Sequence, residues 1–234
     1  MAKRFLEVKG LHGWYGESHV LHGVDFHVDE GEVVTLLGRN GAGRTSTLRA
    51  IMGLIGSRKG SIQVLGQETI AMATHRIARL GIGYCPEERG IFSSLSAEEN
   101  LMLPPQLADG GMSIEQIYTM FPNLKERAQS QGTRLSGGEQ QMLAVARILR
   151  TGARLLLLDE ISEGLAPVIV QKLAEMVLAL RKQGYTIVMV EQNFRFAAPL
   201  ADRFLVMEHG QVIQQFSQAE LPARLDSLHE YLGV

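Results

Sequence analysis

The sequence has 234 residues, of which 45% are hydrophobic, and this suffices for one large domain or two small ones with a substantial core. A formal net charge of −2, without a block rich in lysine and arginine, argues against a general nucleic-acid binder. Cys85 is the single cysteine, which excludes an internal disulfide and fits a reducing compartment, and no run reaches the ~20 apolar residues of a membrane-spanning helix.

The first part of the chain has several strand-like segments and one helix. Apolar and polar residues alternate at 5–11, 24–28 and 61–66, which predicts half-buried strands. Residues 32–38 (EVVTLLG) are more continuously apolar, as in a strand that is buried on both faces. A helix is predicted over 45–55, with apolar residues at helical spacing, namely Leu48, Ile51, Met52 and Ile55.

The loop between this strand and this helix reads GRNGAGRTS over residues 38–46, which is the spacing of a phosphate-binding loop. Its glycines let the backbone turn tightly, so that amides at the helix N-terminus point at phosphate oxygens. Thr45 is placed to bind Mg²⁺, and Arg44, which is planar and wider, replaces the lysine that normally reaches the β- and γ-phosphates. A plain glycine turn before an ordinary helix is the alternative. We predict nucleotide contacts from Gly38, Arg39, Asn40, Gly41, Ala42, Gly43, Arg44, Thr45 and Ser46.

The middle of the chain is richer in helix formers, and residues 90–145 are predicted to form a mostly helical insertion. Ser96 and Glu99 have the spacing of a capping box, and residues 103–113 (LPPQLADGGMS) are typical of a loop. Residues 135–141 (LSGGEQQ) open another helix. Their serine and glycines at a helix N-terminus predict a second anion site, and a plain helix cap is the alternative.

The last third returns to alternating strands and helices. Buried strands are predicted at 153–160 (ARLLLLDE) and 185–192 (YTIVMVEQ), and a hairpin is predicted at 203–216. A helix is predicted over 167–182, and its apolar stripe is expected to consist of Val168, Leu173, Met176, Val177 and Leu180.

Two carboxylates, Asp159 and Glu160, follow four leucines at the end of the first of these strands. A carboxylate at the end of a buried strand can reach a metal at the edge of the sheet, so Asp159 is predicted to bind Mg²⁺ together with Thr45. Glu160 is predicted to polarise the attacking water as a general base. An acidic turn after a buried strand is a common feature, but together with the upstream loop it predicts ATP hydrolysis.

The glycine loop, LSGGEQQ and LLLLDE resemble the motifs of an ABC transporter ATP-binding subunit, and the resemblance covers nearly the whole chain. It implies an α/β fold with a phosphate-loop (RecA-like) nucleotide-binding core and an antiparallel β subdomain, formed by residues 1–89 and 146–234. An inserted α-helical subdomain, residues 90–145, contains the signature LSGGEQQ. The implied cofactors are ATP and Mg²⁺, and the implied activity is ATP hydrolysis coupled to solute translocation.

The resemblance also assigns further site residues. Tyr15 matches the aromatic residue that stacks on adenine, and Trp14 competes for that role. Glu87 stands where most members have a glutamine that contacts Mg²⁺, and Gln192 where most have a histidine that contacts the γ-phosphate. Two cassettes pack head to tail in this family, with residues 162–167 at the partner subunit, so the signature is expected to bind the ATP held by that partner. These signature residues are Ser136, Gly137, Gly138 and Glu139.

Residues 84–101 and 190–213 are similar to ATPase subunits for uptake of branched-chain and related hydrophobic amino acids, in particular to the shorter of the two. The expected partners are a second ATP-binding subunit, transmembrane permease subunits that contact the groove around 87–102, and indirectly a periplasmic solute-binding protein, but no nucleic acid. The chain is expected at the cytoplasmic face of the inner membrane, without a signal peptide or transmembrane helix. The alternatives are an importer of urea or amides, a regulatory half with little hydrolysis, and a soluble ABC protein of translation or DNA repair.

Arg44, Glu87 and Gln192 depart from the general pattern of the family. Glutamine offers an amide to a phosphate oxygen but no positive charge, and Glu87 adds a negative charge near the metal. We therefore expect a slower site than the family average. Four histidines near the N-terminus are interpreted as structural or solvated rather than as a metal site, namely His12, His19, His22 and His27.

Overall fold

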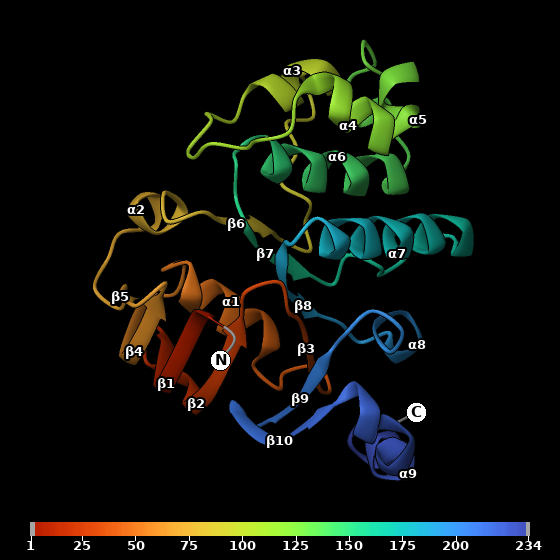
Figure 1. Ribbon diagram of the computed structural model, residues 1–234. Coiled ribbons are helices and arrows are strands. Elements are labelled where there is room, and N and C mark those ends of the chain that lie inside the picture. Colours follow the sequence, from red (N-terminus) through yellow and green to blue (C-terminus); the bar gives the residue numbers. More distant parts are fainter. Residues whose placement is uncertain (1–2, 233–234) are drawn as a thin grey trace.

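The computed structural model describes residues 3–232, which form two sheets and the helices around them (Figure 1). The six-stranded sheet has the order β10-β9-β3-β8-β7-β6, and the four-stranded sheet has the order β2-β1-β4-β5. The first sheet consists of β3 (Val33–Leu37), β6 (Ile82–Cys85), β7 (Leu155–Asp159), β8 (Thr186–Val190), β9 (Arg203–Glu208) and β10 (Gln211–Ser217). The second sheet consists of β1 (Arg4–Tyr15), β2 (Ser18–Asp29), β4 (Ser57–Val64) and β5 (Gln67–Glu68).

The central strands β3, β7 and β8 are buried at every position and pair in parallel with one another. Alternate residues of β7 belong to two apolar clusters. Leu156 and Leu158 are in one cluster with residues of α7, and Leu155 and Leu157 are in the other with residues of α1. Helices therefore cover both faces of the sheet, which explains why these strands read as continuous apolar runs. The buried strands that were predicted at 32–38, 153–160 and 185–192 are confirmed, as is the hairpin formed by β9 and β10.

The antiparallel sheet begins with a hairpin that is longer than predicted. β1 and β2 have 12 residues each, whereas the alternation of residue types predicted strands over 5–11 and 24–28. Register shifts interrupt the pairing of β1 with β2, for example between Val8 and Leu11. A bulge moves the following side chains to the opposite face, so the period-two pattern breaks although the strand continues.

Helices connect the strands and also form the insertion. The core part contains α1 (Arg44–Ile51), α2 (Thr74–Ala78), α7 (Pro167–Lys182), α8 (Phe194–Ala197), the 3₁₀ turn Gln218–Glu220 and α9 (Leu221–Leu232). The insertion contains α3 (Ala97–Met102), α4 (Ile114–Met120), α5 (Pro122–Glu126), the 3₁₀ turn Gly132–Arg134 and α6 (Gly137–Arg150). Figure 1 shows α3, α4 and α5 gathered on one side of α6.

The insertion follows the sequence prediction closely. Residues 103–113 contain no helix or strand, and Ser96 caps α3 in the predicted capping box with Glu99. α6 continues to Arg150, so the predicted subdomain boundary after residue 145 falls inside a helix. Leu143 and Leu149 of α6 are buried in the same cluster as residues of the central strands, so the insertion and the sheet share one apolar core. The division into subdomains at that boundary stays a prediction.

Two helix predictions were wrong in detail. α1 ends at Ile51 rather than near residue 55, because Gly53, which follows the C-cap Met52, adopts a φ of +71° and terminates the helix. Val168 is 60% exposed and does not belong to the buried stripe of α7. It precedes Leu173 by five residues, and this spacing turns its side chain away from the buried face of the helix.

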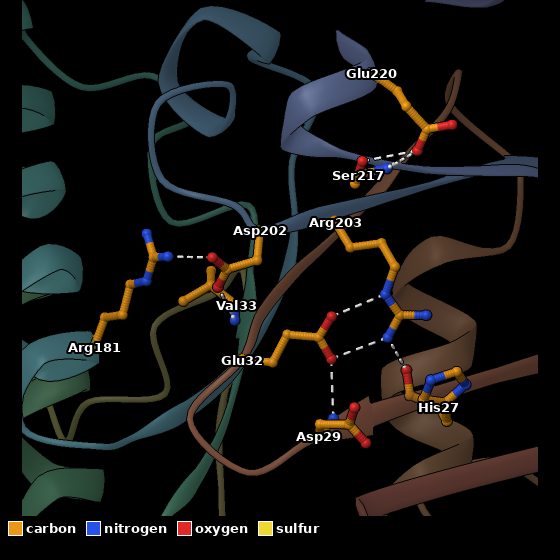
Figure 2. A network of polar contacts seen from close by, with 9 residues as sticks. All are labelled: His27, Asp29, Glu32, Val33, Arg181, Asp202, Arg203, Ser217 and Glu220. Atoms are coloured by element: carbon orange, nitrogen blue, oxygen red, sulfur yellow. Dashed lines mark hydrogen bonds and ion pairs between the residues drawn. The ribbon is translucent and has the colours of Figure 1, made fainter. Parts of the chain in front are cut away.

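A polar network joins the antiparallel sheet to the core near the start of β3 (Figure 2). Arg203 of β9 donates to both carboxylate oxygens of Glu32, at 2.8 and 3.0 Å, and Glu32 also accepts from the amide of Asp29 at 2.9 Å. Asp202 accepts from the amide of Val33 at 2.9 Å and is ion-paired with Arg181 of α7. These charge-assisted bonds hold the beginning of the strand that leads into the glycine loop.

Candidate nucleotide-binding site

The glycine loop connects β3 to α1 where the parallel strands end. Gly43 is the N-cap of α1 with a φ of +101°, and no side chain caps this helix. A Cβ atom at Gly43 would lie 3.1 Å from Cα of Gly210 and from the side chain of Leu21, and one at Gly38 would lie 2.5 Å from the carbonyl oxygen of Met207. Both positions therefore require glycine. The first amides of α1 lack a side-chain cap, which is the arrangement of an anion-binding helix start.

A cavity of about 500 Å³ lies in front of this loop. The segments that follow β3, β6, β7 and β8 all contribute to its wall, because parallel strands end at the same edge of a sheet. The predicted residues in the wall are Asn40, Gly41, Ala42, Gly43, Arg44, Thr45, Ser46, Glu87, Glu160 and Gln192, and the sequence did not predict Val20 and Glu163. The predicted residues Tyr15, Gly38, Arg39 and Asp159 do not line it.

Arg44 lies almost entirely inside the protein, with 4% of its side chain exposed. Its Nη2 atom donates to the Glu160 carboxylate at 2.8 Å and to the Asn40 side chain at 3.3 Å. Its Nη1 atom is buried and has no hydrogen-bond partner among the residues that the structure describes. A buried unpaired N–H costs about 1–3 kcal/mol, and an anion in the cavity would supply the missing acceptor. The substituted cation thus fits a phosphate group.

Asp159 lies below the cavity and is fully buried. Thr45 donates its hydroxyl to one carboxylate oxygen of Asp159 at 2.9 Å, and Tyr84 donates to the other at 2.9 Å. Burial raises the pKa of Asp159, whereas these two hydrogen bonds lower it. The two predicted metal ligands are therefore in contact, and Glu87 adds a third oxygen donor nearby in the cavity wall.

Tyr84 is a residue of this site that the sequence reading missed. It pairs with Leu157 in the parallel register of β6 and β7, and Asp159 lies two residues further along β7, on the same face as Leu157. The sequence signal for this role was a tyrosine in a short apolar strand, and this strand lies beside the one that ends in the acidic turn. Only the pairing of the two strands shows that its hydroxyl reaches that carboxylate.

Glu160 occupies an unusual backbone position, with a φ of +47°. Its amide donates to the carbonyl of Val190 at 2.9 Å, which fixes the turn after β7 against the end of β8. Burial raises the pKa of Glu160 and the Arg44 guanidinium opposes that shift. Gln192 follows β8 and lines the same cavity, so a carboxylate and an amide face the phosphate-binding loop together.

The signature residues lie elsewhere, at the start of α6. The amide of Glu139 donates to Oγ of Ser136 at 3.3 Å, and the amide of Ser136 donates to the Glu139 carboxylate at 2.7 Å. The plain helix cap that we considered as an alternative is thus present. Gly138 packs against Ile169 of α7 so closely that a Cβ atom would lie 2.7 Å from its side chain. None of these residues lines the described cavity, and their contact with a partner's nucleotide stays a prediction.

The aromatic residues at the end of β1 differ in their surroundings. The Trp14 ring stacks on His19 with centroids 4.3 Å apart, and Lys59 lies 5.7 Å from its centroid. Tyr15 is 38% exposed, and its hydroxyl, together with that of Tyr84, raises the pKa of Arg49. The Trp14 ring therefore already packs against other side chains. This favours Tyr15 over Trp14 as the predicted adenine-stacking residue.

Three of the four N-terminal histidines lie together. His12 Nδ1 and His19 Nε2 are 3.1 Å apart, and the rings of His19 and His22 have centroids 4.0 Å apart. Burial lowers the pKa of His19, and the charge of His22 adds to this shift. Across residues 3–232 no group of three or more histidine, cysteine, aspartate and glutamate residues has a geometry suited to a metal ion. In the same range, no helix is long and apolar enough to cross a bilayer.

Comparisons with known proteins agree with the resemblance seen in the sequence. The ABC transporter family model matches residues 21–163. The ATP-binding protein BraG of Pseudomonas aeruginosa, named for high-affinity branched-chain amino acid transport, is 40% identical over 94% of this chain and 96% of its own length. The lipopolysaccharide export system ATP-binding protein LptB of Escherichia coli K12 is 32% identical over 97% of both chains.

Solved structures agree on the fold. An ATP-binding subunit of an ABC transporter superimposes with a TM-score of 0.82 and 28% identity, over 98% of this chain and all of the other. A dimeric ATP-binding cassette with bound ADP and phosphate superimposes with a TM-score of 0.80 over 91% of this chain and 98% of the other; its 23% identity supports the fold. The predicted α/β fold is confirmed, and this chain belongs to the ABC transporter family, as one of its ATP-binding cassettes.

Proposed function

We propose that this chain is the ATP-hydrolysing subunit of an importer for branched-chain or related amino acids. The observation that supports it most strongly is the cavity in which the phosphate-binding loop, Glu160 and Gln192 come together. The similarity to BraG over nearly the full length supports the class of solute. No residue of a cassette needs to touch the transported solute, so the choice of amino acid rests on that similarity.

In this proposal the amides of the loop and Arg44 bind the phosphates of ATP, and Tyr15 stacks on adenine. Thr45, Asp159 and Glu87 would hold Mg²⁺, which would neutralise charge on the phosphates. Glu160 orients the attacking water and accepts its proton. The Arg44 guanidinium has two ends, of which Nη2 is bonded to Glu160 and Nη1 has no partner among the described residues. One cation can therefore contact a phosphate oxygen and the general base at the same time.

The proposed partners follow from the position of the signature. A second ATP-binding subunit, packed head to tail, would place Ser136, Gly137, Gly138 and Glu139 against its own nucleotide, because these residues lie outside the cavity of this chain. Permease subunits would contact the segment 87–102, where Phe92 and Met102 are exposed by 47% and 64%. The chain would then work at the cytoplasmic face of the inner membrane and would depend indirectly on a periplasmic solute-binding protein.

The proposal is tested by isolating the tagged chain from detergent-solubilised membranes of its source and reconstituting the complex in vesicles. We expect a permease and a second cassette to copurify, and the vesicles to take up labelled leucine only with ATP on the cassette side. Uptake of urea or a short amide in place of leucine would favour the alternative importer. Recovery of ribosomes or DNA without a permease would contradict the proposal.

A regulatory half with little hydrolysis is the second candidate. The observation in its favour is the ion pair between Arg44 and Glu160 at 2.8 Å. In this pair the expected base is already bonded to the expected phosphate-binding cation. Turnover measurements distinguish the two candidates. A regulatory half would bind ATP and stay as slow as its Glu160→Gln variant, even in the complete complex.

Replacing Tyr84 with phenylalanine should raise the Mg²⁺ concentration for half-maximal hydrolysis by about tenfold, which is the effect expected when an outer-shell partner of a metal ligand is removed. The change deletes the 2.9 Å bond to Asp159 and leaves the ring in place. Mg²⁺ titrations of turnover at saturating ATP measure the effect. Tyr118→Phe in the insertion is the matched control, and an unchanged Mg²⁺ dependence of Tyr84→Phe would refute the role.

Replacing Gln192 with histidine should increase turnover several-fold, because an imidazolium adds a positive charge that an amide lacks. The gain should be larger at pH 6.5 than at pH 8.5, since histidine loses its charge over that range. Steady-state ATP hydrolysis by the reconstituted complex measures the effect. Gln192→Ala is the companion variant and should slow hydrolysis. A Gln192→His variant with unaltered turnover would count against the hypothesis that this substitution slows the site.

A further inference from the structure

Glu191 is a further carboxylate, which is buried, does not line the cavity and has no role in the mechanism above. It stands between β8 and Gln192, and only 1% of its surface is exposed. Its backbone amide donates to the carbonyl of Leu36 in β3 at 3.3 Å, so the residue is anchored to the central sheet. Lone glutamates are rarely buried to this extent unless their carboxyl group has partners.

Both oxygens of this carboxyl group bind one residue, Ser162, which is also buried. The hydroxyl of Ser162 is 2.7 Å from Oε2 of Glu191, and the amide of Ser162 donates to Oε1 at 3.2 Å. Ser162 lies two residues after Glu160 in the loop that follows β7. The carboxyl group therefore reaches across from the end of β8 and holds the loop that contains the proposed general base.

The loop needs such an anchor because its backbone is strained. Glu160 has a φ of +47°, a conformation that a residue with a side chain keeps only when its surroundings hold it there. The amide of Glu160 donates to Val190 at 2.9 Å, and Ser162 binds the next residue of the same strand end, Glu191. These contacts fasten the loop to the end of β8, in addition to the ion pair between Glu160 and Arg44. Of the described contacts with the end of β8, the one made by Glu191 depends on a side chain.

We propose that Glu191 is a positioning residue for ATP hydrolysis, which holds the 160–163 loop through Ser162 so that Glu160 keeps its place at the phosphate-binding loop. The inference rests on the proposed function, since it concerns the hydrolysis assigned to this site. Gln192 follows Glu191 directly, so the same anchor links the loop after β7 to the amide that faces the γ-phosphate position.

The protonation of Glu191 allows this role to be tested by the pH dependence of hydrolysis. Burial raises its pKa to about 8, the bonds from Ser162 lower it, the carboxylate of Glu160 raises it and the guanidinium of Arg44 lowers it. The carboxyl group is therefore mostly neutral at pH 7 and ionised at pH 9. Ionisation strengthens the bonds from Ser162, which favour the charged carboxyl group, and it also places a second negative charge near Glu160. The titration of Glu191 should therefore make hydrolysis depend on pH between 7 and 9.

The experiment compares Glu191→Ala, Glu191→Gln and Ser162→Ala in the complete transporter complex. We expect Glu191→Ala and Ser162→Ala to lower kcat by about tenfold or more, with the KM for ATP changed less than about twofold, because the loop does not bind the nucleotide directly. Glu191→Gln keeps the shape and one acceptor but does not titrate. It should retain most of kcat at pH 7, and its kcat should change less between pH 7 and 9 than that of the wild type. Glu175→Gln, an exposed glutamate of α7, is the matched control.

Hydrogen exchange of the purified chain without nucleotide tests the anchor independently of turnover. The amides of residues 160–163 should exchange about tenfold faster in Glu191→Ala and in Ser162→Ala than in the wild type at the same pH. If the alanine variant of Glu191 does not fold, Ser162→Ala and Glu191→Gln provide the test. Unchanged exchange, or faster exchange with wild-type kcat, would overturn the inference. A wild type that binds ATP without hydrolysing it would instead contradict the proposed function, and the exchange data would still decide whether Glu191 holds the loop.

Discussion

Replacing Glu160 with glutamine should lower ATP hydrolysis by at least about 100-fold, the contribution expected of a general base. Glutamine preserves the size of the side chain and can still bond to Arg44, but it cannot accept a proton. ATP binding should be retained or slightly tightened, because a negative charge near the phosphates is removed. Single-turnover hydrolysis and equilibrium binding of labelled ATP, measured on the same preparation, test both parts of this expectation.

Glu163 offers a matched control for this substitution. It lines the same cavity and belongs to the same loop, but its side chain is exposed and it makes no bond to Arg44 in the described structure. Glu163→Gln should lower hydrolysis far less than Glu160→Gln does, because Glu163 is exposed and is not bonded to Arg44 in the described structure. If Glu160→Gln hydrolyses ATP as fast as Glu163→Gln, Glu160 is not the base and the proposed mechanism is wrong.

Replacing Arg44 with alanine should weaken ATP binding by about 10- to 100-fold and abolish most hydrolysis, because a charged hydrogen-bond partner of the phosphates is lost. A second effect follows from the ion pair with Glu160 at 2.8 Å. Arg44 lowers the pKa of Glu160, so its removal lets burial raise that pKa further. The residual activity should therefore require a higher pH than in the wild type. ATP titrations and a pH profile of turnover measure these changes.

Two further variants separate charge from shape at this position. Arg44→Lys keeps the charge and should retain binding within about tenfold, but a single ammonium group cannot reproduce the planar fork that meets Asn40 and Glu160. Arg39→Ala removes an exposed arginine of the same loop. Arg39 was predicted from the sequence to contact the nucleotide but does not line the cavity, so the change should alter binding by less than about threefold. Equal binding by Arg44→Ala and Arg39→Ala would show that Arg44 does not contact the nucleotide.

The sequence predicted the core strands and the glycine loop well, for a physical reason. A strand buried on both faces must be largely apolar, as 33–37, 155–158 and 187–190 are, and only glycine fits the conformation at Gly43. The long β1–β2 hairpin and the exposed position of Val168 were misjudged. Bulges break the period-two pattern of the strands. Val168 was assigned to the buried stripe by its apolar type, although its five-residue spacing from Leu173 places it away from that face.

The contacts of Tyr84 with Asp159 and of Glu191 with Ser162 were beyond the reach of the sequence. Each joins two strand ends that are far apart along the chain, and each depends on a strand order in which β7 lies between β6 and β8. The residue types of one strand do not indicate which other strand will lie next to it in the sheet. The sequence named the charged groups of the site, but the residues that hold those groups in position appear only when the sheet is assembled.

By itself, then, the sequence determined the motifs of this protein, namely the glycine loop, the acidic pair after a buried strand and the signature, and the family to which they belong. Those features are local because a loop conformation and a strand end depend on adjacent residues. The tertiary structure decided that Arg44 is paired with Glu160 and has one buried nitrogen without a partner among the described residues. It also placed the buried carboxyl group of Glu191 against Ser162 in the loop that follows β7, since burial and polar pairing arise only from packing between distant segments.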